Sequence, residues 1–408
     1  MLSFIRRLFQ RQPDAARVAS LVLGRLQQQL PGETLVFDPA QYLIRRTGNG
    51  VIYLNNIYRD YCQAAPSRRS EEIARFVLGV VGSGEQPDDL EAARPRLLPV
   101  LRYLAGLDLL WIPNEDLAKP HTPKMIWRPF SPALGVAVAI DSEHSIAQVG
   151  RPDLERWGIT FDEAFAIAVD NLRHKAAPAF TQVSPGLYMS HYGDYYDAAR
   201  VLLQELAWQL PLAGEPVAMM PNRVCLLLCG ADDPAALADM VGRARQILRE
   251  QSRPLSSEMF RLRGNAWAPW SPQGEAGGAL AQLQREDRMA DYAEQKAALE
   301  KAHEAAGIDV FVAAHTLIQR NSDGAFLSYA VLPKGVDTWL PEADLIVLSE
   351  SAEGEPTMVS WAHFVEHASH LLERLSFAAP RWKVLGFPEG ECLRKLRQVA
   401  TNWDDAKV

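Results

Sequence analysis

The sequence predicts an α+β protein of three helix-flanked modules whose sheets are mainly antiparallel. Apolar residues recur at helical spacing in some segments, and short apolar runs bounded by turn residues occur in others. The first and third modules share one order of elements, a helix, a meander of strands and a second helix. The chain of 408 residues is also too long for one ordinary domain.

Two helices are expected in the first module, which we place at residues 1–120. The first covers residues 15–30 and ends at Pro31-Gly32, a helix-stop signal. The second lies near residues 70–81, with Ser70 as its N-cap and acidic residues in its first turn. Both helices would cover the strands that lie between them in the sequence.

The strands of the first module are short apolar runs, at residues 34–37, 42–44 and 51–54. The turn residues Gly48-Asn49-Gly50 make the last two runs a predicted hairpin. Two further apolar runs follow at residues 97–102 and 107–112. Residues 113–123 are polar and contain proline and lysine, so we expect a linker there.

The central module is expected over residues 121–263. It opens with an apolar strand at residues 134–140. Thr160-Phe161-Asp162-Glu163 is a capping box, so a helix should begin there and end near Asn171-Leu172. Residues 194–200 are expected to open a second helix, and residues 220–228 to form one strand.

A loop and a third module complete the predicted organisation. Residues 264–279 are rich in glycine, proline and tryptophan without periodicity, and we interpret them as the main inter-module loop. The third module covers residues 280–408. It should open with a charged helix at residues 280–306, stopped by Gly307. A strand at 308–312, a hairpin around 321–324, a strand at 344–348 and a final helix at 360–375 should follow.

Composition and charge exclude some classes of function. Lys plus Arg total 42 and Asp plus Glu 50, so a net charge of −8 argues against a nucleic-acid binder. No Walker loop or dinucleotide fingerprint follows a predicted strand, and we expect no cofactor. The four cysteines show no C-x-x-C spacing of a zinc or redox site. Their small number and the lack of a secretory signal favour a reducing compartment and a cytoplasmic location. Cys225 and Cys229 are expected to be small core residues.

The first twelve residues form an amphipathic segment. On a helical wheel, one half carries the apolar residues Leu2, Phe4, Ile5, Leu8 and Phe9, and arginines lie on the other half. We expect this segment, residues 1–12, to dock on the body of the protein itself. The alternative is contact with an anionic membrane surface or an acidic partner.

The motif His363-Phe364-Val365-Glu366-His367 matches the H-x-x-E-H pattern of inverted zinc peptidases. On a helix, His363 and His367 would share a face, as two ligands of one metal must, and Glu366 could polarise a water. The helical wheel instead places these side chains opposite the apolar stripe, in solvent. We therefore expect no metal site, and a metal-dependent hydrolase is the alternative function.

The most polar segment of the central module lies at residues 194–200. Asp194 occupies a predicted N-cap position and Asp197 the first turn, and Arg200 could pair with Tyr196 or Asp197 at helical spacing. Capping and local pairing explain these residues, and a binding role is the alternative. Our candidate binding residues are Asn171, Asp194, Tyr196, Asp197, Arg200, Arg223, Trp267 and Trp270, and no catalytic residue is assigned.

Taken together, these features resemble the YtpQ-like family of bacterial proteins of unknown function. The similarity is strongest over residues 157–256 and fainter at residues 54–58 and 98–100. The residues that carry it are Asn171-Leu172, Asp194, Tyr196-Asp197-Ala198, Arg200, Gly214-Glu215, Pro221 and Pro254-Leu255-Ser256. Similar proteins tend to read Pro-x-Arg-Asp at the strand start, whereas Val224 follows Arg223 here. The resemblance implies no known reaction.

The sequence therefore predicts a cytoplasmic, non-catalytic protein that binds another protein or a small ligand. An enzyme would need a dry, concave site with perturbed ionisable groups. An interaction protein would instead show a broad apolar or aromatic surface.

Overall fold

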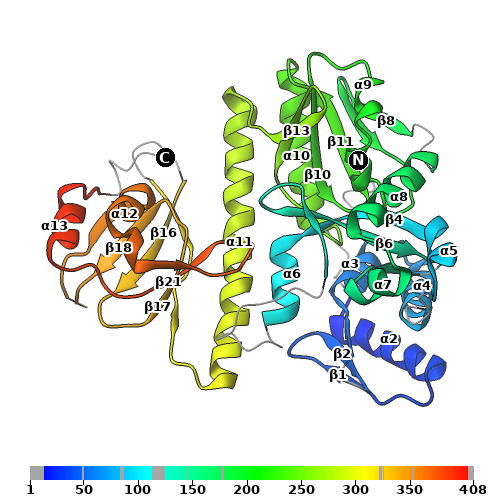
Figure 1. The fold of residues 1–408 in the computed structure, drawn as a ribbon, viewed down its shortest axis with the longest axis horizontal. Coiled ribbons are helices and arrows are strands. Elements are labelled where there is room, and N and C mark those ends of the chain that lie inside the picture. Colours follow the sequence, from blue (N-terminus) through cyan, green and yellow to red (C-terminus); the bar gives the residue numbers. More distant parts are fainter. Residues whose placement is uncertain are drawn as a thin grey trace. The chain divides into compact units, whose positions relative to one another are not determined.

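A computed structural model of the chain describes residues 13–47, 50–82, 87–112, 125–143, 145–175, 179–320, 324, 326–351 and 353–402. Residues 1–12 and the predicted linker at 113–123 therefore lie outside the described residues. The helices and mainly antiparallel sheets confirm the α+β class (Figure 1). The chain divides into two compact units. Unit 1 is Met1–Leu101, Lys124–Arg128 and Val136–Trp270, and unit 2 is Arg102–Pro123, Pro129–Gly135 and Ser271–Val408.

Unit 1 begins with a helix, a three-stranded meander and two further helices. In chain order these are α2 (Ala15–Gln29), β1 (Leu35–Asp38), β2 (Leu43–Arg46), β3 (Val51–Tyr53), α3 (Asn55–Gln63) and α4 (Arg69–Gly82). The order β1-β2-β3 is antiparallel, which confirms the predicted hairpin, and α2 and α4 confirm the two predicted helices. Ser70 is not the N-cap, because α4 begins at Arg69. Its hydroxyl instead accepts a hydrogen bond from Arg25.

A second part of unit 1 surrounds the predicted strand at residues 134–140, which is β6 and is almost wholly buried. The strand order is β4-β6-β5, and β7 also pairs with β6. Thr160 and Glu163 form the expected capping box. The elements are α5 (Leu90–Ala93), η1 (Arg94–Arg96), β4 (Leu97–Tyr103), β5 (Arg128–Pro129), β6 (Leu134–Asp141), β7 (Ile146–Gln148), α7 (Arg151–Trp157) and α8 (Phe161–His174).

The largest sheet of unit 1 has six strands in the order β13-β12-β10-β11-β9-β8. Its strands are β8 (Phe180–Ser184), β9 (Leu187–Ser190), β10 (Pro216–Asn222), β11 (Cys225–Gly230), β12 (Met259–Arg263) and β13 (Ala266–Pro269). Helix α10 (Pro234–Glu250) packs on β10 and β11 (Figure 1). Cys225 and Cys229 are buried in this core, as expected.

Two expectations for the central module are wrong. Residues 220–228 do not form one strand, because the chain turns after Asn222 and its side chain accepts a hydrogen bond from the backbone N–H of Val224. Residues 194–200 do not open an α-helix. A 3₁₀ helix, η3 (Ala198–Leu202), begins later and is followed by α9 (Gln204–Trp208).

Unit 2 contains two four-stranded sheets, with the orders β14-β17-β21-β20 and β15-β16-β18-β19. Helices α12 and α13 pack on the second sheet (Figure 1). The elements are α6 (Leu104–Trp111), α11 (Gly274–Ala306), β14 (Phe311–Val312), β15 (Thr316–Gln319), β16 (Phe326–Pro333), β17 (Thr338–Pro341), β18 (Leu345–Ser349), β19 (Thr357–Ser360), α12 (Trp361–Ala368), η4 (Ser369–Leu371), β20 (Leu372–Arg374), β21 (Arg381–Val384) and α13 (Gly390–Gln398).

Two boundaries near unit 2 differ from expectation. The segment expected as a loop at residues 264–279 contains β13 and the first turns of α11. The final helix, expected over residues 360–375, ends at Ala368, and the chain continues as η4 and β20. The end of α11 is as predicted, with Gly307 in the left-handed conformation at φ 65°. Within the described part of the chain, no helix has the length and apolarity that a membrane crossing requires.

Candidate binding site in unit 1

Buried polar side chains gather around one region of unit 1. They come from the ends of β9 and β10, from η3 and the residue before it, and from the segment after α10, and they are Ser190, Asn222, Asp197, Arg200, Ser252, Ser256 and Ser257. Buried polar groups must be paired within the protein, because they have lost their hydrogen bonds to water. Their partners therefore define how this region is held.

The central contact is an ion pair between Asp194 and Arg200. The two guanidinium nitrogens Nη1 and Nη2 donate to Oδ1 and Oδ2 of Asp194 at 2.8 and 2.6 Å. The Arg200 side chain has no exposed surface, and its guanidinium lies 3.6 Å from the ring centroid of Tyr192. Asp194 also accepts from the backbone N–H of Tyr196. The predicted pairing of Arg200 with Tyr196 or Asp197 is thus replaced by a pairing with Asp194.

The pKa of Asp194 reflects this pairing. Burial acts to raise the pKa, but the hydrogen bonds and the positive charge of Arg200 outweigh it and hold the pKa below its ordinary value. Asp194 is therefore an ionised structural partner of a buried cation.

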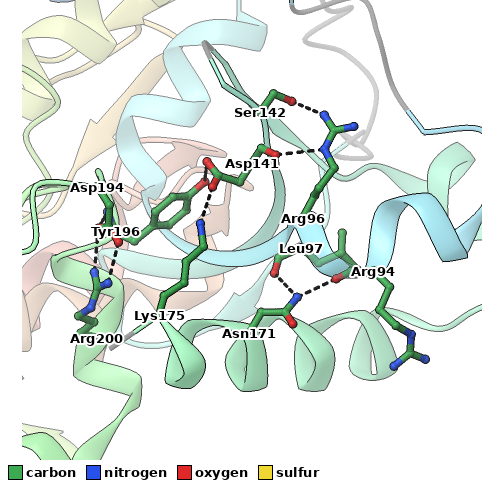
Figure 2. A network of polar contacts seen from close by, with 10 residues as sticks. All are labelled: Arg94, Arg96, Leu97, Asp141, Ser142, Asn171, Lys175, Asp194, Tyr196 and Arg200. Atoms are coloured by element: carbon green, nitrogen blue, oxygen red, sulfur yellow. Dashed lines mark hydrogen bonds and ion pairs between the residues drawn. The ribbon is translucent and has the colours of Figure 1, made fainter. Parts of the chain in front are cut away.

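A second contact chain runs through Asp141 at the end of β6. The Tyr196 hydroxyl donates to Oδ1 of Asp141 at 3.0 Å, and Lys175 donates to Oδ2 at 2.8 Å. Figure 2 shows Asp141 between these two side chains. Burial, and then the charge of Asp141, raise the pKa of Tyr196. The phenol therefore stays protonated and donates its hydrogen bond.

Asn171 lies one turn before Lys175 on α8 and also has a structural contact. Its side-chain amide donates to the backbone carbonyls of Arg94 and Leu97, at 2.7 and 2.9 Å (Figure 2). These carbonyls lie at the two ends of η1. Asn171 therefore ties α8 to the turn that leads into β4.

Asp197 and Arg223 take part in the hydrogen bonds that hold the segment around η3 and the β10–β11 turn. Asp197 is 1% exposed, and its Oδ1 accepts from the backbone N–H of Tyr192 at 3.1 Å. The backbone carbonyl of Arg223 accepts from the N–H of Ala198, and the N–H of Arg223 donates to the carbonyl of Arg253, each at 3.3 Å. The turn is thus bonded to two segments distant in sequence.

Arg253 connects this region to helix α3. Its backbone N–H donates to Oδ1 of Asn56, and its Nη1 pairs with Oδ2 of Asp60 at 2.9 Å. Its guanidinium lies 5.5 Å from the ring centroid of Tyr195. Both residues of this contact have left-handed backbones, with φ of 66° at Tyr195 and 55° at Arg253. For residues with a Cβ this conformation is strained.

The two candidate tryptophans lie at the β13 end of the six-stranded sheet. Trp267 lies on β13, and its indole N–H donates to the carbonyl of Val201 at 2.8 Å. Trp270 lies beside Arg261, whose guanidinium is 5.2 Å from its ring centroid. Both side chains therefore contact residues of their own unit.

The histidine motif lies in unit 2, on α12. His363 and Glu366 are exposed and His367 is partly buried, whereas Phe364 and Ala368 are buried on the other face. Among the described residues, no group of three or more His, Cys, Asp or Glu side chains is arranged to hold a metal ion.

Sequence reasoning missed several residues of the site. Asp141 accepts hydrogen bonds from both Tyr196 and Lys175, and Ser252 donates to Asp60 across 192 positions. Segments around Asn56, Tyr195 and Pro221 reach the residues at 253–255 by hydrogen bonds and a cation–π contact, and no local spacing in the sequence relates them. No family model, curated protein or solved structure matches the chain.

Proposed function

We propose that the protein is a non-catalytic protein-binding protein of the bacterial cytoplasm. Its contact area would be the junction surface, which we define as Tyr195, Val224 and Arg253. The single observation that carries the proposal is the contact between Tyr195 and Arg253, two strained non-glycine residues from segments distant in sequence. The predicted YtpQ-like resemblance stays a prediction beside it.

Backbone strain of this kind is costly, at about 1–3 kcal/mol for each residue, and it is concentrated at functional sites. It persists at Tyr195 because both neighbours are held, Asp194 by Arg200 and Tyr196 by Asp141. It persists at Arg253 because its N–H, its carbonyl and its guanidinium all have partners. The surrounding network thus fixes the conformation that presents the two side chains.

The residue types suit a protein partner. Tyrosine and arginine are enriched among the residues that dominate binding energy at protein interfaces. Val224 is 37% exposed at the tip of the β10–β11 turn, and it adds an apolar contact beside Arg223. A surface held rigid before binding loses little entropy when a partner docks, so a small area can bind well.

The ionisable groups beneath the surface support binding over proton transfer. Asp194 is ionised and uses both oxygens on Arg200, and Tyr196 is kept protonated. A general base needs a pKa near the working pH, and neither group is shifted in that direction. The four free cysteines accord with the proposed reducing location.

A photo-crosslinking amino acid placed at Val224 tests the proposal. In the native host, we expect it to form a discrete adduct with one protein, because this exposed position belongs to the proposed contact. The matched control is the same amino acid at Val36, which is 55% exposed on β1 of the same unit. Mass spectrometry of the two adduct sets measures the difference.

The result that supports the proposal is an adduct at position 224 that is absent at position 36. Identical adducts at both positions, or none at position 224, would contradict a protein contact at the junction surface. Circular dichroism of both proteins confirms that each has folded before the comparison is made.

A further inference from the structure

A small pocket in unit 2 has polar walls and contains no residue of the junction surface. Its volume is about 150 Å³, and it is lined by Ala281, Gln284, Arg285, Arg288, His315, Ser328 and Asp344. Four of these lie on one face of α11 at helical spacing. Of the others, His315 directly precedes β15, Ser328 lies on β16 and Asp344 directly precedes β18. A space of this size accommodates about five water molecules, and so a ligand of about five or six heavy atoms.

The pocket has an excess of positive charge. Arg285 and Arg288 line it, and neither has an ion-pair partner among the residues that the structure describes. Arg381 is fully buried near His315, and its Nη1 and Nε donate to backbone carbonyls and to Gln295 and not to a carboxylate. Among the described residues that line the pocket, Asp344 is the one acidic side chain.

His315 is an unpaired polar group in the wall. It is 8% exposed and stacks on Tyr292, with ring centroids 4.9 Å apart, and neither ring nitrogen has a hydrogen-bond partner among the described residues. Burial, and then the charge of Arg288, lower the pKa of His315 to about 4. A neutral imidazole has one donor and one acceptor nitrogen, and leaving both unpaired in a buried wall is unfavourable. A ligand in the pocket would supply the missing partner.

Asp344 restricts which anions fit. Its Oδ2 accepts from the backbone N–H and the hydroxyl of Ser328, at 2.7 and 2.8 Å. The other oxygen, Oδ1, is therefore the one left to accept from a ligand. The negative charge of Asp344 would repel an anion that has no proton to donate. An anion that carries an O–H or N–H group would instead donate a hydrogen bond to Oδ1.

We propose that the pocket binds a small oxyanion that also carries an O–H or N–H group, with Arg285, Arg288 and His315 on its oxygens and Asp344 on its donor. Hydrogen phosphate and an amino-acid carboxylate are two sources of this chemistry. Arginine suits both, because its planar guanidinium pairs with two oxygens at once.

Isothermal titration of the full chain at constant ionic strength tests the proposal with four probes. Inorganic phosphate and glycine carry the required proton, and sulfate and acetate of similar size do not. We expect one-site binding of phosphate, glycine or both, about tenfold tighter than their proton-free counterparts. Which of the two binds identifies the source.

Three variants and a control locate the site. Arg285→Gln and Arg288→Gln should each weaken binding by about tenfold or more, whereas Lys301→Gln, at an exposed position on the same helix, should leave it unchanged. Asp344→Asn should reverse the preference and favour sulfate over phosphate, because an amide can donate to an unprotonated oxygen.

The proposal is overturned if none of the four probes binds saturably. It is also overturned if binding survives both arginine substitutions, or if Asp344→Asn leaves the order of the probes unchanged. Melting curves of the variants accompany each titration. Because Arg288 is exposed and Arg285 partly exposed, we expect these variants to melt like the wild type.

Discussion

Replacing Asp194 by alanine is expected to lower the free energy of unfolding by about 3–5 kcal/mol, because it leaves a buried cation without its partner. The Arg200 side chain has no exposed surface, so the cation depends on this carboxylate for its charge partner. As an N-cap, Asp194 would have been worth only about 0.5–2 kcal/mol. Urea unfolding followed by far-ultraviolet circular dichroism measures the difference.

A double-mutant cycle with Arg200→Met provides the control for this prediction. Removing both charges should cost less than removing Asp194 alone, because the double variant has no unpaired buried charge. If the loss of stability in the double variant equals the sum of the losses in the two single variants, the pairing is contradicted. A loss below about 1 kcal/mol in Asp194→Ala would show that the ion pair is not buried in solution.

The same pair gives a pH dependence with a defined sign. The pKa of Asp194 is lowered in the folded state relative to an unfolded value of about 3.9. The ion pair therefore contributes its full stability above about pH 4, and this contribution is lost as the pH falls through the folded pKa. The stability difference between the wild type and Asp194→Asn should shrink in that acid range.

Replacing Arg381 by methionine is expected to cost about 2–4 kcal/mol in unit 2. Arg381 is fully buried at the start of β21. It donates to the carbonyls of Ala313 and Trp339, at 3.0 and 2.9 Å, and to Gln295 of α11 at 2.7 Å. Methionine fills much of the volume but leaves the Ala313 carbonyl and the Gln295 side-chain oxygen without this donor, each costing about 1–3 kcal/mol, whereas the Trp339 carbonyl keeps the N–H of Ala313. The variant no longer buries a charged guanidinium, and the desolvation cost that it avoids offsets part of this loss.

Hydrogen exchange measured peptide by peptide checks this prediction. Protection should fall in the peptides that contain β14, β17 and β21, since Arg381 connects these strands to α11. Arg374→Met, at an exposed position on β20, is the matched control and should exchange like the wild type. Unchanged protection in Arg381→Met would contradict the role of this arginine in holding the sheet.

The sequence was most informative where one local signal dominated. The capping box at Thr160 and Glu163, the stop at Gly307 and the hairpin of β2 and β3 were all predicted correctly. Each depends on residues close together in the chain, which set the local backbone by hydrogen bonding or by allowing a left-handed conformation.

The wrong boundaries have physical reasons. Strands β10 and β11 are buried on both faces, so the polar alternation that separates one strand from the next is missing. The turn between them contains neither glycine nor proline. The apolar spacing of α12 continues into Leu371 and Leu372, which reach the same core from η4 and β20. A helical pattern therefore seemed to extend past Ala368.

The site was predicted only in part. Asp194, Tyr196, Asp197 and Arg200 were found from their local clustering, but the partner of Arg200 depends on the turn that Tyr195 makes in the left-handed region. The contacts of Arg253 with Asn56 and Asp60 join segments that sequence spacing cannot relate. The pocket around His315 likewise forms only when α11 packs beside the sheet that contains β15 and β16.

The proposal that the strain at Tyr195 serves binding is tested most directly by Tyr195→Gly. Glycine adopts φ of 66° without penalty, so the relief of strain should offset the lost contact with Arg253. We expect stability within about 1 kcal/mol of the wild type and at least about a tenfold loss of the adduct formed at position 224.

Tyr42→Gly is the control, because Tyr42 is also left-handed, at φ 51°, but its ring packs against Phe37 and Tyr58. The Tyr42→Gly variant should be less stable than the wild type, and its folded fraction should still form the adduct at position 224. The test compares two quantities for each variant, the crosslinking yield at position 224 and the midpoint of urea unfolding. The account predicts an unchanged midpoint and a lost adduct for Tyr195→Gly, and a lowered midpoint with a full adduct yield would contradict it.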